Sequence, residues 1–413
     1  MRIKARTVLI IGVVLREVFS FWTGHPFDFE LWVRTGYWVA HGASPYGVLP
    51  AVPGLSFASV YSIQAAPTTG YLPFWPLLTA ALYELYTAIG VQSRFFLYFL
   101  LKQPIIVGDV LLGYTLYQYA KMRYSDRAGW VLKFWLLSPL NIFLSGVWGM
   151  FDSLSMLFVA LALKSGEQNF RAVGSGVATF VKSIPLIYAI PLSFSGGKKL
   201  KSLIIALGIP TLLSLAVLVV TGWSLQRAYE AIFSTVAKGG ESLSAADILF
   251  YLRRLGLVNA AQLEVMKPLA YAWIAAVLVA MFIAYRRFGF REDRALLQSL
   301  LLCTIAFLLF RLQVNEQYAV YFFALAAIDV SIWNPGRRRI LLSNLVVVLA
   351  YIVVNSPLLL RFISPVFPDM LQSEQILIIL YNQPRFILKA TLAFVFSILN
   401  VWYLVALLRR RGV

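Results

Sequence analysis

Two carboxylates, Asp28 and Glu30, follow the first long apolar run of this 413-residue chain. They begin the segment FDFELWVRTGYWVAHGASPYG, which is rich in aromatic residues and ends in a Gly-x-Ser-Pro-Tyr turn. Hydrophobicity explains a membrane span, but it does not explain paired acids just beyond the end of one. A carboxylate held in a cleft at this place can take a proton from an acceptor hydroxyl as a general base. The alternatives are that the acids are only solvated and that the aromatic residues form an interface belt.

Three further ionisable side chains interrupt apolar runs: Asp109, Asp152 and Lys182. An ionisable group within a span is costly in free energy and is a functional hypothesis by default. Lys182 stands in Phe-Val-Lys-Ser-Ile-Pro, where Pro185 should break a helix, and a cation at a broken helix is a suitable phosphate partner. The alternative is an intramembrane ion pair between Lys182 and one of the two acids.

A late junction, Phe-Arg-Leu-Gln-Val-Asn-Glu-Gln-Tyr, concentrates Arg311, Glu316 and Gln317 beyond the outer end of an apolar run. A cation, an acid and amides so close together exceed what a plain connecting loop needs, and we expect binding groups here. The two histidines, His25 and His41, both fall in the first outer segment, but their spacing matches no standard ligand pattern. We therefore expect no metal and no other cofactor. The chain also lacks a Walker loop, which leaves soluble nucleotide chemistry unsupported.

The composition identifies the class of protein. The chain is 60% hydrophobic and only 13% charged, with a mean hydropathy of +0.77, whereas soluble domains carry about 25% charged residues. We expect an all-α, polytopic integral membrane protein with about 10–12 transmembrane helices in a single domain over residues 1–413, because helices satisfy their own backbone in lipid. The net charge of +18 comes from basic clusters in short loops between spans, so membrane lipids rather than nucleic acid are the expected partners.

The same basic clusters predict the topology, with both termini in the cytoplasm. The ten expected crossings are residues 7–23, 104–120, 130–147, 148–163, 200–222, 266–287, 295–310, 318–333, 339–360 and 384–408. Residues 71–102, broken by prolines and Gly90, are expected to form juxtamembrane or re-entrant helices on the outer side. Residues 172–194, flanked on both sides by basic clusters, are expected to form two half-helices that dip toward the active face and return. The long extracytoplasmic segments are then 24–70, which carries the acids, and the amphipathic 223–262.

In its order of motifs the chain resembles the GT-C membrane glycosyltransferases, in particular GPI mannosyltransferase I and prokaryotic polyprenyl-phosphate-mannose-dependent mannosyltransferases. The resemblance rests on Asp28-x-Glu30, on Gly-Ala-Ser-Pro-Tyr46 and on Tyr71-Leu-Pro, with Asp replaced by Glu at position 30. Later patches are similar as well: Asp109, Trp-Gly-x-Phe-Asp152, Phe-x-Lys182 and Asn-Glu316-Gln317-Tyr.

This resemblance implies an inverting transfer of a hexose, with mannose as the family's sugar, from a polyprenyl- or dolichyl-phosphate donor. The acceptor would be a lipid-linked or other glycan acceptor on the outer face of the cytoplasmic membrane. It implies catalytic roles for Asp28 and Glu30. It implies substrate contacts for Tyr46, Asp109, Asp152, Lys182, Arg311, Glu316 and Gln317.

A secondary transporter or a lipid flippase is the competing class, because broken helices and intramembrane charges are also transporter features. The position of the acids discriminates between them. The acids of an enzyme should converge on one outer cavity, whereas those of a transporter should lie near the middle of the membrane.

Overall fold

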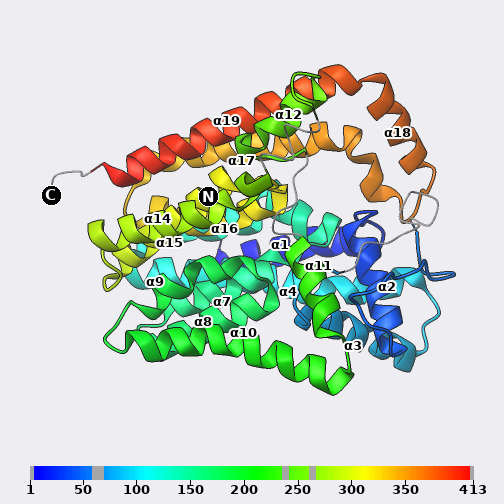
Figure 1. The fold of residues 1–413 in the computed structure, drawn as a ribbon, viewed down its shortest axis with the longest axis horizontal. Coiled ribbons are helices and arrows are strands. Elements are labelled where there is room, and N and C mark those ends of the chain that lie inside the picture. The colour runs from blue at the N-terminus through cyan, green and yellow to red at the C-terminus, as the bar shows by residue number, and fades with distance from the viewer. Residues whose placement is uncertain (1–3, 58–68, 235–240, 260–266, 410–413) are drawn as a thin grey trace.

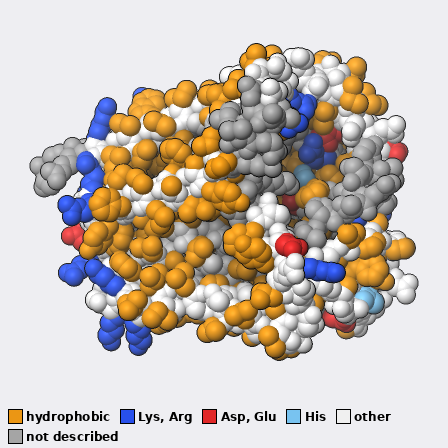
Figure 2. Space-filling view, in the orientation of Figure 1, with side chains coloured by type: hydrophobic (Ala, Val, Ile, Leu, Met, Phe, Trp, Pro, Cys, Tyr) orange, Lys and Arg blue, Asp and Glu red, His pale blue; other side chains and the backbone are white. Residues whose placement is uncertain are grey.

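The computed structural model describes residues 4–57, 69–234, 241–259 and 267–409, and every regular element in these ranges is helical. Figure 1 shows the long helices lying roughly side by side, with α2 (Asp28–Ala40), α3 (Phe74–Ile89) and α18 (Met370–Leu380) toward the opposite end of the molecule from the C-terminus. Many large apolar side chains face outward along the long helices (Figure 2). The protein is therefore an all-α, polytopic membrane protein, as the composition predicts.

One end of the molecule, the basic end, brings together the loops that the sequence places in the cytoplasm. Arg123, the last residue of the helix Arg94–Arg123, and Arg171, in the first turn of the helix Gln168–Val181, both pair with Asp293. Arg337 donates to the carbonyl of Ala406 at 2.7 Å. Figure 2 shows lysine and arginine side chains along this edge. The basic clusters that the sequence places in the cytoplasm thus lie at one end of the molecule. Of these clusters, Arg2 and residues 410–411 lie outside the described residues.

Ten segments run alternately away from and toward the basic end, in the order expected for the ten crossings. They are α1 (Ala5–Ser20), α4 (Arg94–Arg123), α5 (Ser125–Leu136) continued by α6 (Pro139–Ile142) and η2 (Phe143–Trp148), α7 (Asp152–Lys164), α10 (Lys199–Thr221), α14 (Ala272–Arg287), α15 (Asp293–Phe310), α16 (Ala319–Ile332), α17 (Arg338–Asn355) and α19 (Asn382–Leu408). A short helix precedes α14 (η5, Lys267–Tyr271), α16 (η6, Glu316–Tyr318) and α17 (η7, Pro335–Arg337).

By length and apolarity, six of the described helices can cross a membrane, or seven if the α5–η2 segment, bent by 43°, is one span. This is fewer than the 10–12 expected. The difference lies in α1, α7 and α16, which have 16, 13 and 14 residues, whereas a lipid-facing span needs about 20. Every residue of α16 is buried. A helix enclosed by other helices does not have to match the thickness of the lipid.

The stretch 71–102 differs from its prediction. Its first part is α3 (Phe74–Ile89), which packs on α2 (Asp28–Ala40) at the end of the molecule opposite the basic end. We call this the outer end, after the side that the sequence predicts for it. Its last part, from Arg94, is the beginning of α4, which runs through Pro104 as one helix of 30 residues. Proline removes one backbone hydrogen bond and normally kinks a helix. Here tertiary packing keeps the helix continuous, so residues 94–102 belong to the crossing rather than to a re-entrant loop.

The stretch 172–194 forms the hairpin that its flanking charges predict. Helix α8 (Gln168–Val181) leaves the basic end, and η3 (Ile184–Tyr188) with α9 (Ala189–Ser193) returns to it. The Gln168 side chain closes the hairpin, because it donates to the Ser193 carbonyl at 2.7 Å and accepts from the Lys198 amide at 3.0 Å. Lys182 lies at the turn between the two arms.

The outer end carries the remaining short elements: α11 (Leu225–Ser234), η4 (Ala245–Asp247), α12 (Ile248–Arg254), η8 (Pro357–Ile363) and α18 (Met370–Leu380). Helix α11 is amphipathic, with Leu225, Tyr229 and Phe233 exposed on one face and Ala228 and Ala231 buried on the other. Of the two long outer segments, residues 58–68, 235–240 and 260–262 lie outside the described residues.

The orientation of the two ends can be measured by cysteine labelling in a Cys303→Ala background. Gln226, on α11, and Lys201, near the basic end, are both exposed. We expect Gln226→Cys to react with an impermeant thiol reagent from outside intact cells and Lys201→Cys to react only after lysis, because basic loops stay in the cytoplasm. The reverse pattern would invert the orientation. Ser242, which the sequence suggests as an outer position, is buried against the Leu312 carbonyl and makes a poor reporter.

Candidate functional site

Asp28 lies in the first turn of α2 and is held by two aromatic rings. The indole nitrogen of Trp148 donates to Asp28 Oδ2 at 2.9 Å. The His25 ring stacks on Trp148, with centroids 4.7 Å apart, and Phe362 of η8 packs against both rings. His25 Nδ1 accepts the backbone amides of Phe27 at 3.2 Å and Asp28 at 3.1 Å, which caps the beginning of α2. The carboxyl group is therefore fixed in position while 18% of its side chain stays exposed.

The surroundings of Asp28 bring its pKa close to neutral. Burial raises the pKa of Asp28 to about 6, against opposing effects from the Trp148 hydrogen bond and the charge of Lys182. The nearby charges of Glu316 and Asp152 raise it further. Burial and Arg361 lower the pKa of His25, which agrees with a neutral ring whose Nδ1 accepts two amides. A carboxylate with a pKa near 6 is well matched to accept a proton at neutral pH.

Lys182 and Asp152 form an ion pair beside this acid. Lys182 Nζ donates to Asp152 Oδ2 at 2.7 Å, and both side chains are buried. Three rings surround the ammonium group, Phe151 at 4.7 Å, Tyr71 at 5.5 Å and Tyr318 at 5.6 Å. The intramembrane-pair alternative for Lys182 thus holds for Asp152, and not for Asp109. A phosphate bound by Lys182 would have to share it with this carboxylate.

The segment 310–318, which includes η6, lies beside the Lys182–Asp152 pair. Arg311 lies over the Tyr318 ring at 5.5 Å, and Lys182 contacts the same ring at 5.6 Å. Glu316 accepts a hydrogen bond from Asn355 at 2.8 Å. Gln317 is buried, and its side-chain oxygen has no partner among the described residues. The structure therefore brings Asp28, Asp152, Lys182, Arg311 and Glu316 together, as the sequence predicts.

Tyr71 is a member of this group that sequence reasoning did not assign to the site. Burial raises the pKa of its hydroxyl, and the charge of Asp28 raises it further. Tyr71 also contacts Lys182 through its ring. The Tyr71-Leu-Pro pattern was the available signal, but its spacing alone does not show which way the ring points.

Glu30 is not part of the site, which corrects its expected catalytic role. Its side chain is fully buried, pairs with Arg34 Nε at 2.7 Å and accepts the Phe57 amide at 3.0 Å. The reason is geometric: Asp28 and Glu30 stand two positions apart on a helix, and such side chains diverge. Glu30 therefore fixes the loop that follows α2.

Asp109 also lies outside the site. It pairs with Arg16 at 2.7 Å and accepts hydrogen bonds from Ser145 at 3.0 Å and from Trp135 at 3.0 Å, with no exposure to solvent. Arg16 is the partner that the sequence did not identify, because the two residues are 93 positions apart. The group joins α1, α4 and the π-helical turn η2, so Asp109 is a structural residue rather than a substrate contact.

Tyr46 supports the site without contacting its charged groups. Its hydroxyl donates to the Tyr71 carbonyl at 3.2 Å, and its ring packs edge-on against Trp223. We therefore assign it to positioning the Tyr71 segment.

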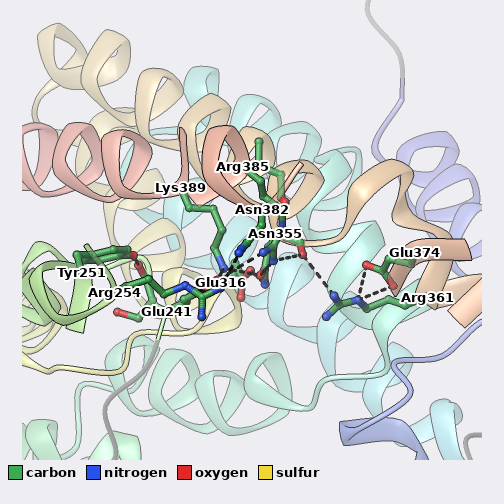
Figure 3. Close-up of polar contacts among 12 residues, drawn as sticks. Glu241, Tyr251, Arg254, Glu316, Asn355, Arg361, Glu374, Asn382, Arg385 and Lys389 are labelled. Carbon is green, nitrogen blue, oxygen red and sulfur yellow. Dashed lines mark hydrogen bonds and ion pairs between the residues drawn. The ribbon is translucent and has the colours of Figure 1, made fainter. Parts of the chain in front are cut away.

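A second polar group at the outer end was missed entirely by sequence reasoning. Figure 3 shows Glu241 facing Arg254, Arg385 and Lys389, with Asn355 bridging from this group toward Glu316. Arg385 and Lys389 lie in the first turns of α19. The sequence predicts this segment only as the beginning of a membrane span. We call Glu241, Arg254, Arg385 and Lys389 the Glu241 cluster.

Among the described residues, no group of three or more His, Cys, Asp or Glu side chains has a geometry that could hold a metal ion. No family model and no curated protein matches this chain. The likeness to the GT-C enzymes therefore rests on the residues quoted above.

The Lys182–Asp152 pair can be tested through stability. We expect Lys182→Met to lower the free energy of unfolding by about 3–5 kcal/mol, because it leaves a buried carboxylate without its cation. The double variant Lys182→Met with Asp152→Asn should recover most of this loss in a thermal-unfolding measurement in detergent. Lys201→Met, an exposed lysine, is the matched control and should be near neutral. A double variant as unstable as the single one would contradict the pairing.

Proposed function

We propose that this protein is an inverting glycosyltransferase that moves a hexose from a polyprenyl-phosphate donor to a hydroxyl of a glycan or glycolipid acceptor. The observation that carries the proposal is Asp28, a half-buried carboxyl group with a pKa of about 6 that is fixed by Trp148 and lies near Lys182. Asp28 and Arg311 both lie close enough to Tyr71 to affect the pKa of its hydroxyl. The GT-C resemblance agrees with it and suggests mannose as the sugar. We place the reaction on the extracytoplasmic side of the cytoplasmic membrane, because the site lies away from the basic end.

The reaction is a single displacement at the anomeric carbon. The acceptor oxygen forms the new glycosidic bond while the bond between the anomeric carbon and the phosphate oxygen breaks. The acceptor proton passes to the Asp28 carboxylate, and the electron pair leaves with the polyprenyl phosphate. Arg311 is the proposed contact for the leaving phosphate, whose growing negative charge a guanidinium group stabilises. Lys182 adds positive charge nearby but is partly neutralised by Asp152.

A transporter remains the second candidate, because the α8–η3 hairpin carries an ion pair at its turn, and broken helices with buried charges line transport sites. The two functions differ in what they require of Asp28. An enzyme needs its basicity for bond formation, whereas a transporter would move substrate without forming any glycosidic product.

The base is tested by Asp28→Asn, which keeps the shape of the side chain but removes its basicity. Transfer from a polyprenyl-phosphate sugar to an acceptor should fall by roughly 10²–10⁴, measured as product formed by purified protein in lipid. The variant should also unfold at a higher temperature at neutral pH. The folded state raises the pKa of Asp28 above its unfolded value, so ionisation weakens folding as pH rises from about 4 to 6. Near-normal transfer by this variant would remove Asp28 from the reaction.

The pH dependence of transfer gives an independent test. Activity should rise through a pKa near 6 as Asp28 ionises and should stay high above it. Trp148→Phe removes a hydrogen bond that favours the carboxylate, so this limb should move to higher pH. A limb that stays in place in the Trp148→Phe variant would show that another group controls the profile.

A further inference from the structure

The Glu241 cluster holds more positive charge than its own carboxylate can balance. Glu241 pairs with Lys389 directly, and with Arg254 and Arg385 at 3.7 Å each. Three cations thus surround one carboxylate, which leaves two positive charges uncompensated within the cluster. Glu316 lies on the far side of the Asn355 amide and belongs to the site described above. Uncompensated cations are costly where they are buried, and the Lys389 side chain is only 1% exposed.

The backbone adds to this excess. Arg385 and Lys389 lie in the first two turns of α19, which has no acidic residue in its first turn. The beginning of a helix carries a partial positive charge, so it favours anions and disfavours cations. Two basic side chains at this end of a helix are unfavourable for folding alone, but they suit the binding of an anion.

The contacts of Glu241 are not those of a complete anion site. A carboxylate has two oxygens, and only Lys389 is within hydrogen-bond distance of them, while both arginines stay at 3.7 Å. A phosphate group has more oxygens and up to two charges, and guanidinium groups bind it through paired N–H donors. A phosphate at this position could therefore contact Lys389 together with Arg254 Nε and Arg385 Nη1, which face Glu241. The other nitrogens of the two arginines keep their hydrogen bonds to Asn382, Val354 and Asn355.

The cluster is accessible to a ligand through Arg254. The Arg254 side chain is 40% exposed, and it lines a small cleft of about 50 Å³ with Asn382 and Phe386. Figure 2 shows basic side chains in a hollow on this face of the molecule. Just before α19, Ile379 and Leu380 are exposed apolar residues on α18. Glu241 occupies the place between the three cations, so a phosphate can bind there only if this carboxylate moves away. The neighbouring apolar surface suits a lipid chain.

We propose that Arg254, Arg385 and Lys389 bind the phosphate group of a membrane lipid, and that Glu241 occupies this phosphate position until the lipid displaces it. The lipid is an anionic acceptor or the polyprenyl-phosphate part of the donor, since both present the same chemistry. This inference gives the protein a phosphate site separate from Arg311. The choice of these two lipids rests on the proposed function. Asn355 connects the new site to Glu316, next to the proposed base.

The test measures binding of two probes to the purified full chain in nanodiscs: a short-chain polyprenyl monophosphate and phosphatidylinositol. Arg254→Gln should weaken the binding of at least one probe roughly 10- to 100-fold, the loss expected for one charge-assisted hydrogen bond. Arg253→Gln, an exposed neighbour on the same helix, is the matched control and should bind as the wild type does. Glu241→Gln should strengthen binding, because it removes the competing charge while keeping the shape.

The outcomes separate the possible ligands and the two proposals. An effect on the monophosphate alone assigns the site to the donor, and an effect on phosphatidylinositol assigns it to an anionic acceptor. If Arg254→Gln binds both probes like Arg253→Gln, and Glu241→Gln does not strengthen binding, Glu241 is only a structural counter-ion and this inference is wrong. Such a result would leave the proposed function intact if transfer still depends on Asp28. Conversely, lipid binding that depends on Arg254, without any sugar transfer, would reject the proposed function and keep the phosphate site.

Discussion

Two buried cations join the segments that carry the site, and the position of Asp28 depends on them. Arg16 of α1 pairs with Asp109 of α4 and donates to Ser145. Within the described part of the chain Lys102 donates to no carboxylate. Its ammonium group donates to the carbonyls of Thr23 at 2.7 Å, Gly146 at 2.8 Å and Val147 at 3.2 Å. These carbonyls lie at or beyond the ends of α1 and η2, where backbone acceptors lose their partners within the helix.

This arrangement explains how the Asp28 carboxyl group is held in a fixed position at the beginning of α2. Lys102 holds the Thr23 carbonyl, two residues before His25, and the Val147 carbonyl, directly before Trp148. His25 and Trp148 are the rings that fix Asp28. A charged group in a water-poor interior must find acceptors or lose several kcal/mol, so the lysine binds these carbonyls tightly. The rigidity needed at the site is thus supplied by a residue that takes no part in the chemistry.

The buried charges fall into two kinds according to their partners. Arg16 with Asp109 and Arg34 with Glu30 are enclosed pairs that hold segments together. By contrast, Asp28 is partly exposed, and the cations of the Glu241 cluster outnumber their acid. Groups of the second kind have interactions left to make with a ligand. Burial of a charge is therefore a weak sign of function in this protein, whereas an incomplete set of partners is a better one.

The sequence by itself determined the class of protein, the basic end, the alternating order of the segments and the hairpin around Lys182. These depend on hydropathy and on loop charge, which are local properties of the chain. It also suggested a common outer site for Asp28, Asp152, Lys182, Arg311 and Glu316, although it placed Glu30, Asp109, Tyr46 and Gln317 in the same site.

Only the tertiary structure decided which acids are available. The sequence offers Asp28 and Glu30 as two carboxylates of the same segment and does not show which one reaches the site. The turn of α2 directs Asp28 toward Trp148 and Glu30 toward Arg34. Asp109 and Asp152 both interrupt spans, yet their cations, Arg16 and Lys182, come from distant segments. The Glu241 cluster likewise joins residues about 150 positions apart. The charge that a buried group retains for a ligand depends on its partners in space, and a single sequence does not specify them.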